Sequence, residues 1–248
     1  MKTFRRYLLS YLCTLLLPVL VLSVVIYEVI VSYYGAQLLE QNLSSLQQLS
    51  LAVSMQRDQL DAYAVQTTNR SEFFYRNQQN PGDIFQVQSI LTRWIAENGF
   101  IDDICYYNPR LNKVYACDAV YSVDDYARWR MQGLLSEEIS EIIGSDNIHC
   151  WRLGEDQLYY FASARVSPTE RNWLICRLSR PTLDAMIEGT RLYNESGTYI
   201  CDADGTVLYA SDLLEDAGDY LGLAQDSGIV RIGQRDMMYA RLEENGLT

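Results

Sequence analysis

The sequence predicts an α+β protein in which an N-terminal transmembrane helix leads into a long stalk helix and then into two antiparallel-sheet units, the second of them incomplete. Three observations predict this order: a long uncharged run near the N-terminus, a heptad-like stripe of apolar residues behind it, and short strand patterns separated by turn residues after Gly99. The chain has 248 residues, of which 48% are hydrophobic, so one or two packed domains fit beside the membrane segment.

The N-terminal segment has the charge pattern of a membrane anchor. Basic residues in the first six positions precede an uncharged run from Tyr7 to Tyr27, and about 20 apolar residues span a bilayer core. Because basic residues favour the cytoplasmic side, we expect a cytoplasmic tail over residues 1–6, a transmembrane helix over 7–34 and an extracellular chain from about residue 35. A cleaved signal peptide is the alternative, but bulky tyrosines occupy the position where its cleavage site would fall.

A stalk helix is expected over residues 35–80, because apolar residues recur there at heptad-like spacing in an otherwise polar stretch. Two interpretations remain open at this stage. The stripe packs on the protein's own domain or forms a seam between two chains of a homodimer, and both can hold at different heights of the helix. Its members are Leu39, Leu43, Leu46, Val53 and Leu60.

The first sheet unit is expected over residues 81–179. It opens with a second amphipathic helix that ends near Asn98 and Gly99. Five strands follow, and the links between them are short, so the sheet is predicted to be antiparallel. The strand segments cover residues 100–108, 113–118, 147–153, 157–166 and 172–178, with short helices expected within 121–134 and 136–144.

The second unit is expected over residues 180–248, beginning with a connecting helix. The strand pattern then restarts at "GTYICDADGTVLYAS", where Asp204-Gly205 is a strong hairpin turn pair. Compared with the first unit, the last residues, "EENGLT", reach only the start of the final strand. We therefore expect that the sequence ends inside this unit; a natural four-stranded unit is the alternative.

Composition argues against several functions. The formal net charge of −12 disfavours direct nucleic-acid binding. No nucleophile motif, phosphate-binding loop or zinc pattern is present, and His149 is the single histidine, so we expect no enzyme, no cofactor and no metal. A Cys105–Cys117 disulfide is chemically allowed outside the cell, but small buried thiols are the favoured interpretation.

The order of these segments resembles the double Cache family of bacterial extracellular sensors, whose sheets are PAS-like. The hairpin "IDDICYYNPRLNKVYACDAVYS" and the later "GTYICDADGTVLYAS" carry this resemblance. The N-terminal anchor also resembles those of membrane-bound AraC-type transcriptional regulators and sensor histidine kinases. The resemblance implies that the membrane-distal unit binds a small ligand and that helices relay the signal to a cytoplasmic module not contained in this sequence.

Aromatic and arginine residues of the first unit are the candidate ligand-binding residues. Aromatic walls with a guanidinium suit a small anionic or zwitterionic molecule. The segment "YARWR" contains residue types of the family's amino-acid-binding motif, but its spacing departs from that motif. The alternative is that these are core aromatics and solvated arginines. The candidates are Tyr106, Tyr121, Tyr126, Arg128, Trp129, Tyr160 and Arg165.

Two functional hypotheses follow. The first is a membrane-anchored, homodimeric sensor that binds a small molecule outside the cell and controls an AraC-type DNA-binding or histidine kinase module. The second is an anchored surface protein that binds a protein or wall partner without signalling.

Overall fold

A computed structural model describes residues 2–74, 80–131, 134, 136–145, 148–155, 157–167, 170–190, 197–201, 207–210, 227–232 and 235–240. The chain divides into two compact units. One comprises residues 1–45 with 225–241, and the other comprises residues 46–224 with 242–248. Each unit is described by itself.

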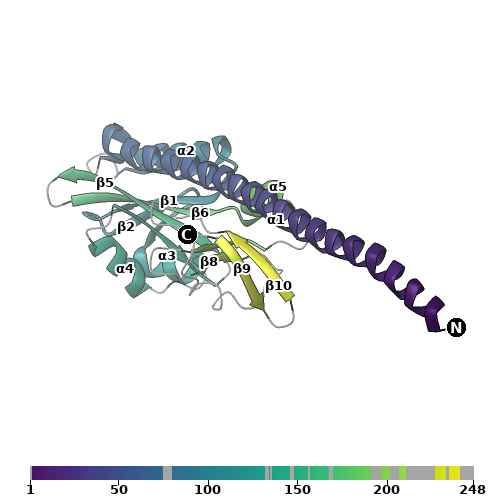
Figure 1. The fold of residues 1–248 in the computed structure, drawn as a ribbon. Coiled ribbons are helices and arrows are strands. Elements are labelled where there is room, and N and C mark those ends of the chain that lie inside the picture. The colour runs from purple at the N-terminus through teal and green to yellow at the C-terminus, as the bar shows by residue number, and fades with distance from the viewer. Residues whose placement is uncertain are drawn as a thin grey trace. The chain divides into compact units, whose positions relative to one another are not determined.

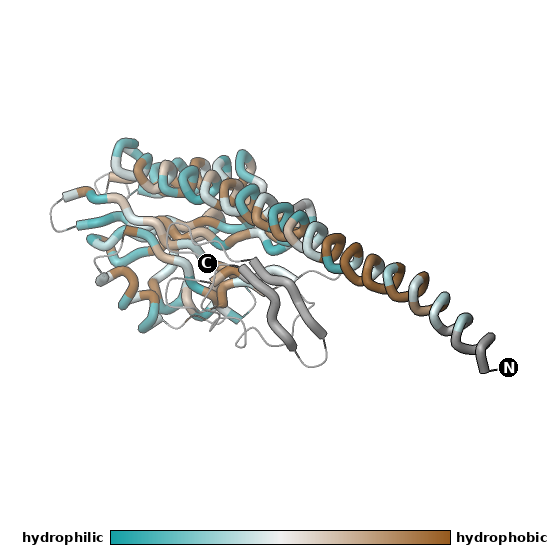
Figure 2. Tube along the Cα trace, viewed as in Figure 1, coloured by the Kyte–Doolittle hydropathy of each residue, from teal (hydrophilic) through white to brown (hydrophobic). Residues whose placement is uncertain are grey.

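The first helix, α1, is continuous from Lys2 to Asn69 and contains Pro18. Its most apolar window has a mean hydropathy of 2.5, and by length and composition it can cross a membrane. Figure 2 shows this window as a continuous hydrophobic stretch of the helix. The helix is therefore consistent with the predicted anchor, while its orientation stays a prediction.

The larger unit is built on an antiparallel sheet (Figure 1). Its strand order is β3-β2-β1-β6-β5-β4. The α+β class and the five predicted strands are confirmed. The structure adds a sixth strand, β3, which has only three residues. The strands are β1 (Ile101–Asn108), β2 (Lys113–Ala116), β3 (Val120–Ser122), β4 (His149–Leu153), β5 (Leu158–Ser167) and β6 (Glu170–Leu178).

Helices cover both faces of this sheet. One face packs against the part of α1 from residue 46 onward and against α2, and the opposite face packs against α3 and α4 (Figure 1). We refer to these as the stalk face and the α3/α4 face. A short 3-10 helix, Ser71–Phe73, follows α1. The other helices are α2 (Pro81–Glu97), α3 (Val123–Arg130), α4 (Ser136–Gly144) and α5 (Arg180–Thr190).

The stalk face has an aromatic core. The Trp94 ring is stacked between Tyr63 and Phe73, with ring centroids 4.8 Å and 5.7 Å away. On α1, Val53 and Leu60 are buried in the same core. At these two positions the predicted apolar stripe therefore packs on the protein's own sheet, because the sheet lies on that side of the helix, and it is not available as a seam between chains.

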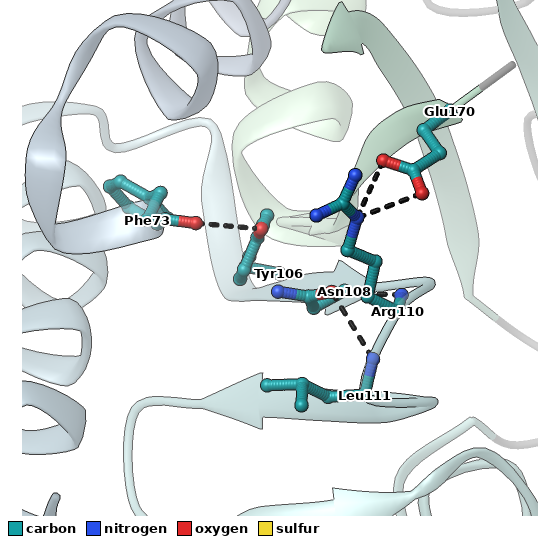
Figure 3. Close-up of polar contacts among 6 residues, drawn as sticks. All are labelled: Phe73, Tyr106, Asn108, Arg110, Leu111 and Glu170. Atoms are coloured by element: carbon teal, nitrogen blue, oxygen red, sulfur yellow. Dashed lines mark hydrogen bonds and ion pairs between the residues drawn. The ribbon is translucent and has the colours of Figure 1, made fainter. Parts of the chain in front are cut away.

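Side-chain hydrogen bonds hold the β1–β2 turn (Figure 3). Asn108 Oδ1 accepts bonds from the backbone N–H groups of Arg110 and Leu111 at 3.0 and 3.4 Å. The Arg110 guanidinium then forms an ion pair with Glu170 at 2.7 Å, which joins this turn to the start of β6. In this turn the Asn108 side chain supplies the acceptor that a neighbouring strand would otherwise offer to these two backbone N–H groups.

The cysteines are free thiols wherever the structure describes them. Cys105 pairs in register with Ala116, so the neighbouring Cys117 points to the opposite face of the sheet. This geometry contradicts the Cys105–Cys117 disulfide and confirms buried or half-buried thiols. Burial raises the pKa of the Cys105 thiol well above its usual value, which makes it a poor nucleophile.

Two antiparallel hairpins lie in the region predicted as the second unit. In the larger compact unit, β7 (Tyr199–Cys201) pairs with β8 (Val207–Ala210). In the other compact unit, β9 (Ser227–Ile232) pairs with β10 (Arg235–Ala240). The predicted strand pairs are thus confirmed, whereas the Asp204-Gly205 turn and the "EENGLT" ending lie outside the described residues.

Candidate functional site

Two of the predicted ligand residues meet at the α3/α4 face. The Tyr121 ring of β3 and the Tyr126 ring of α3 have centroids 5.7 Å apart. Tyr126 is buried against the sheet, and Tyr121 is half-buried beside it. α3 is positioned here by its N-cap, where the Ser122 hydroxyl accepts a hydrogen bond from the backbone N–H of Asp125.

Two other predicted residues lie on the opposite side of the sheet. Tyr106 and Tyr160 are fully buried in the stalk-face core. The Tyr106 hydroxyl donates to the backbone oxygen of Phe73 at 3.2 Å (Figure 3), and the Tyr160 hydroxyl donates to Asp61 on α1 at 2.8 Å. One pocket cannot be lined by both pairs of tyrosines, because the sheet itself separates them.

The three remaining predicted residues are exposed. Arg128 and Trp129 follow Tyr126 on α3, and the Trp129 side chain is 71% exposed. Arg165 is exposed near the hairpin end of β5, opposite Arg171 of β6. The structure therefore brings together only Tyr121 and Tyr126 from the predicted set.

A polar pair that the sequence analysis did not single out lies on the α3/α4 face. Asp103 of β1 and Arg177 of β6 are direct neighbours in the antiparallel register, and Tyr159 of β5 follows Arg177 in the same row. Asp103 is only 9% exposed. Arg177 Nε is buried and has no hydrogen-bond partner among the described residues, so this donor is left for another acceptor.

Burial dominates the protonation behaviour of this site. It raises the pKa of Asp103, and the nearby positive charges of Arg177 and Arg130 only partly counter it. The Asp103 carboxylate already accepts a hydrogen bond from the Ile104 backbone N–H at 2.9 Å. Burial also raises the pKa of Tyr126 well above its usual value, so its hydroxyl keeps its proton and remains a donor.

A second charged pair lies at the same end of the sheet. Arg130, the last residue of α3, forms an ion pair with Asp118, which follows β2. The Tyr121 hydroxyl donates to the same Asp118 carboxylate at 3.2 Å, and the Arg130 guanidinium lies 6.0 Å from the Tyr121 ring centroid. These contacts connect α3 to the strands beneath it.

Together these groups form a charge-balanced polar site. Two carboxylates, Asp103 and Asp118, face two guanidiniums, Arg130 and Arg177, so their formal charges sum to zero. A buried carboxylate binds an ammonium group well, and a guanidinium binds a carboxylate through two hydrogen bonds. These groups are of the chemical types that would meet the two charged ends of a small zwitterion, and the buried Tyr126 lies on the same face of the sheet. Among the described residues, no cluster of His, Cys, Asp and Glu suits a metal ion.

The sequence did contain one signal for the polar pair. Asp103 and Arg177 are charged residues that directly adjoin the apolar runs 104–107 and 173–176, and a charge at a core-facing position is seldom without a role. Which of the alternating strand residues faces the α3/α4 side could not be decided from sequence, because that depends on which helices cover each face.

Several solved sensory domains of bacterial receptors have a similar fold. The ligand-binding domain of the Campylobacter jejuni chemoreceptor Tlp3 in complex with L-norvaline is similar with a TM-score of 0.57 and 10% sequence identity, over 86% of this chain and 89% of that one. The isoleucine-bound Tlp3 sensory domain has a TM-score of 0.53 and 10% identity, over 88% and 92%.

A third similar structure is the extracellular domain named vpHK1S-Z8 and described as that of a histidine kinase, with a TM-score of 0.52 and 9% identity over 81% of this chain and 84% of that one. At such identities the likeness shows the fold alone. No protein-family model and no curated protein matches the chain.

Proposed function

We propose that this chain is the extracellular sensing part of a membrane-anchored signal-transduction protein, and that it binds a small zwitterionic molecule such as an amino acid. The observation that carries the proposal is the buried Asp103 beside the half-buried Arg177 on the α3/α4 face. Its fold is shared with sensory domains whose structures hold isoleucine and L-norvaline, which supports the same ligand class here.

The charge balance favours a zwitterion over a simple anion. The four charged groups of the site already neutralise one another, so an anion would add an uncompensated charge to a partly desolvated region. A zwitterion adds no net charge. Its ammonium group would meet Asp103, and its carboxylate would meet the free Nε donor of Arg177.

The test uses the full chain in lipid nanodiscs with a panel of the common L-amino acids, matched simple carboxylates and matched amines. Binding is measured by calorimetry and by the shift of the unfolding temperature. We expect at least one amino acid to bind, and neither its carboxylate nor its amine analogue to bind. Asp103→Asn and Arg177→Met should each weaken binding about tenfold or more, since each removes one charged contact.

The control variant is Arg93→Met. Arg93 is an exposed arginine that pairs with Glu97 on the same helix, α2, and this helix covers the stalk face, away from the candidate site. The control variant should leave binding unchanged. Absence of binding to any panel member by the intact chain would reject a zwitterion sensor. Equal loss in all three variants would show a general charge effect and would reject the assigned site.

We also infer that two chains associate through α1. From residue 48 onward, the exposed side of the helix repeats at alternating steps of three and four residues, the spacing of a coiled-coil seam. Its members are Gln48, Leu51, Met55, Asp58, Ala62 and Val65. Two chains anchored in one membrane with the same orientation would align these seams in parallel, and the ligand signal would pass along them.

The relay ends in a cytoplasmic output module, either an AraC-type DNA-binding domain or a histidine kinase. This part of the proposal rests on the resemblance of the N-terminal anchor and on the kinase-associated domain of the same fold. Sequencing the gene beyond codon 248 tests it directly. A second apolar span followed by one of these modules is expected, and a continuation without any span would reject the relay.

A further inference from the structure

One charged residue interrupts the proposed α1 seam. The seam members Leu51 and Met55 are 60% and 63% exposed, so pairing with a second copy would remove apolar surface from water. Asp58 follows Met55 at the next position of the seam, and its side chain is 68% exposed. It is the single charged member of the seam. A carboxylate therefore lies in the middle of a surface whose apolar members favour burial.

A parallel pairing of two seams would bring this charge against itself. In a two-fold symmetric dimer, a residue on the seam meets the same residue of the second copy. The two Asp58 carboxylates would thus face each other, and like charges oppose association. In coiled coils the residues beside the seam often supply opposite charges. Beside Asp58 the chain has Ser54, Gln59 and Asp61, so the second copy offers no counterion from these positions.

The counterion of Asp58 comes from its own chain. The Arg57 guanidinium donates to Asp58 Oδ1 at 3.1 Å and to the Ser54 hydroxyl at 3.4 Å. The Arg57 side chain is only 13% exposed, so it neutralises Asp58 without covering the seam. Arg57 Nε is buried and has no hydrogen-bond partner among the described residues, a cost that the packing of a single chain does not explain.

We propose that Asp58 and Arg57 set the affinity between two copies of this chain, an inference that rests on the proposed α1 dimer. The Asp58 carboxylates oppose the pairing of the seams. Each Arg57 reduces this opposition, because it neutralises the carboxylate of its own chain before the second copy arrives. The dimer is therefore held by the apolar seam members and kept reversible by the two carboxylates.

The test measures association of the full chain in lipid vesicles. Donor-labelled and acceptor-labelled copies are mixed, and energy transfer between them is followed as the protein-to-lipid ratio is lowered. Asp58→Asn removes the charge with little change of shape and should tighten the dimer about two- to fivefold. Arg57→Met leaves two carboxylates without counterions and should weaken the dimer by a similar factor. The double variant Arg57→Met/Asp58→Asn should associate like Asp58→Asn, because no carboxylate remains to be neutralised.

An ion pair outside the seam controls for net charge. Arg93 and Glu97 form an exposed pair on α2, and Arg93→Met and Glu97→Gln make the same changes of charge as the two seam variants. Neither should alter the association. Added salt gives a second check, because it screens exposed charges. It should strengthen the Arg57→Met dimer and leave the Asp58→Asn dimer nearly unchanged.

An Asp58→Asn dimer no tighter than the parent dimer would overturn the inference. A double variant as weak as Arg57→Met would overturn it too, because Arg57 would then act through the fold. Asp58→Asn decides the question even if Arg57→Met does not fold, since Asp58 is exposed. If the parent chain gives no energy transfer, the α1 seam is rejected together with this inference. If Leu51→Ala weakens the parent dimer while Asp58→Asn changes nothing, the seam holds and only the role of the charges is rejected.

Discussion

At the residue scale, the Asp103–Arg177 pair sets the behaviour of the candidate site. Removing the guanidinium leaves a buried carboxylate without its neighbouring charge, which is more costly than removing both partners. We expect Arg177→Met to lower the free energy of unfolding by about 2 kcal/mol. The double variant Asp103→Asn/Arg177→Met should recover part of that loss. Urea unfolding of the full chain at neutral pH measures this, and a double variant no more stable than Arg177→Met would contradict the assigned coupling.

The pH dependence of Asp103 has a definite sign. Its folded-state pKa is raised above the unfolded value of 3.8, so the stability that it contributes is present at low pH and is lost as pH rises through the folded pKa. Relative to Asp103→Asn, the parent chain should therefore lose stability as the pH rises from acid through that pKa. Unfolding curves of both proteins across this pH range check the sign, and an opposite trend would show that Arg177 outweighs burial.

Individual residues were the least predictable part of the molecule from sequence. Tyr106 and Tyr160 were expected beside a ligand, but both are buried in the stalk-face core. Their chain neighbours Cys105 and Tyr159 face the α3/α4 side instead. A strand pattern that is apolar on both faces does not show which face will be covered by which helix. Cys105 lies opposite Ala116, one residue before Cys117, so the two thiols face opposite sides of the sheet and cannot form a disulfide.

At the element scale, α1 carries leucines on two sides, to which the proposed dimer assigns different roles. Leu60 is fully buried against the sheet, whereas Leu51 is 60% exposed on the side of the proposed seam. Leu60→Ala should lower the free energy of unfolding by about 2–5 kcal/mol because it leaves a cavity in the core. Leu51→Ala should change the stability of one chain by less than about 0.5 kcal/mol and should weaken dimerisation.

These two leucine variants are matched in chemistry and differ only in their side of the helix. Their stability is measured by denaturant unfolding, and their association by analytical ultracentrifugation in detergent. If Leu51→Ala associates as tightly as the parent, the exposed side is not the seam. If Leu51→Ala lowers the free energy of unfolding as much as Leu60→Ala does, the assignment of the buried and exposed sides is wrong.

Longer elements followed from sequence better than short ones. The hydrophobic periodicity of residues 84–95 predicted α2, and apolar runs bounded by turn residues predicted β1, β5 and β6. β3 was missed because three residues, Val120–Ser122, are too few to show alternation, and its pairing with β2 depends on tertiary contacts. The apolar stripe of α1 was recognised, but its partner proved to be the adjacent sheet at Val53 and Leu60.

At the scale of the whole molecule, the larger compact unit links the candidate site to its second, smaller sheet through α5. β6, which carries Arg177, runs into α5, and Arg180 at the start of that helix lies 4.7 Å from the Tyr209 ring centroid of β8. The Tyr209 hydroxyl donates to Asp184 of α5 at 2.6 Å, and Arg180 forms an ion pair with the same carboxylate at 3.3 Å. These three side chains are the contacts through which a displacement of β6 would reach β8.

This connection allows the proposed ligand binding and its transmission to be tested separately. Tyr209→Phe keeps the ring under Arg180 but removes the hydroxyl bond to Asp184, which is worth about 1–2 kcal/mol at a partly buried charged acceptor. We expect the ligand affinity at Asp103 and Arg177 to remain within about twofold of the parent, since Tyr209 contacts neither residue in the described structure. The ligand-induced protection of amide hydrogens in β8, measured by hydrogen exchange, should in contrast be clearly reduced. If affinity and protection fell together, Tyr209 would serve only to stabilise the fold; if neither changed, the signal would leave the site through the stalk face instead, where Tyr160 and Asp61 join β5 to α1.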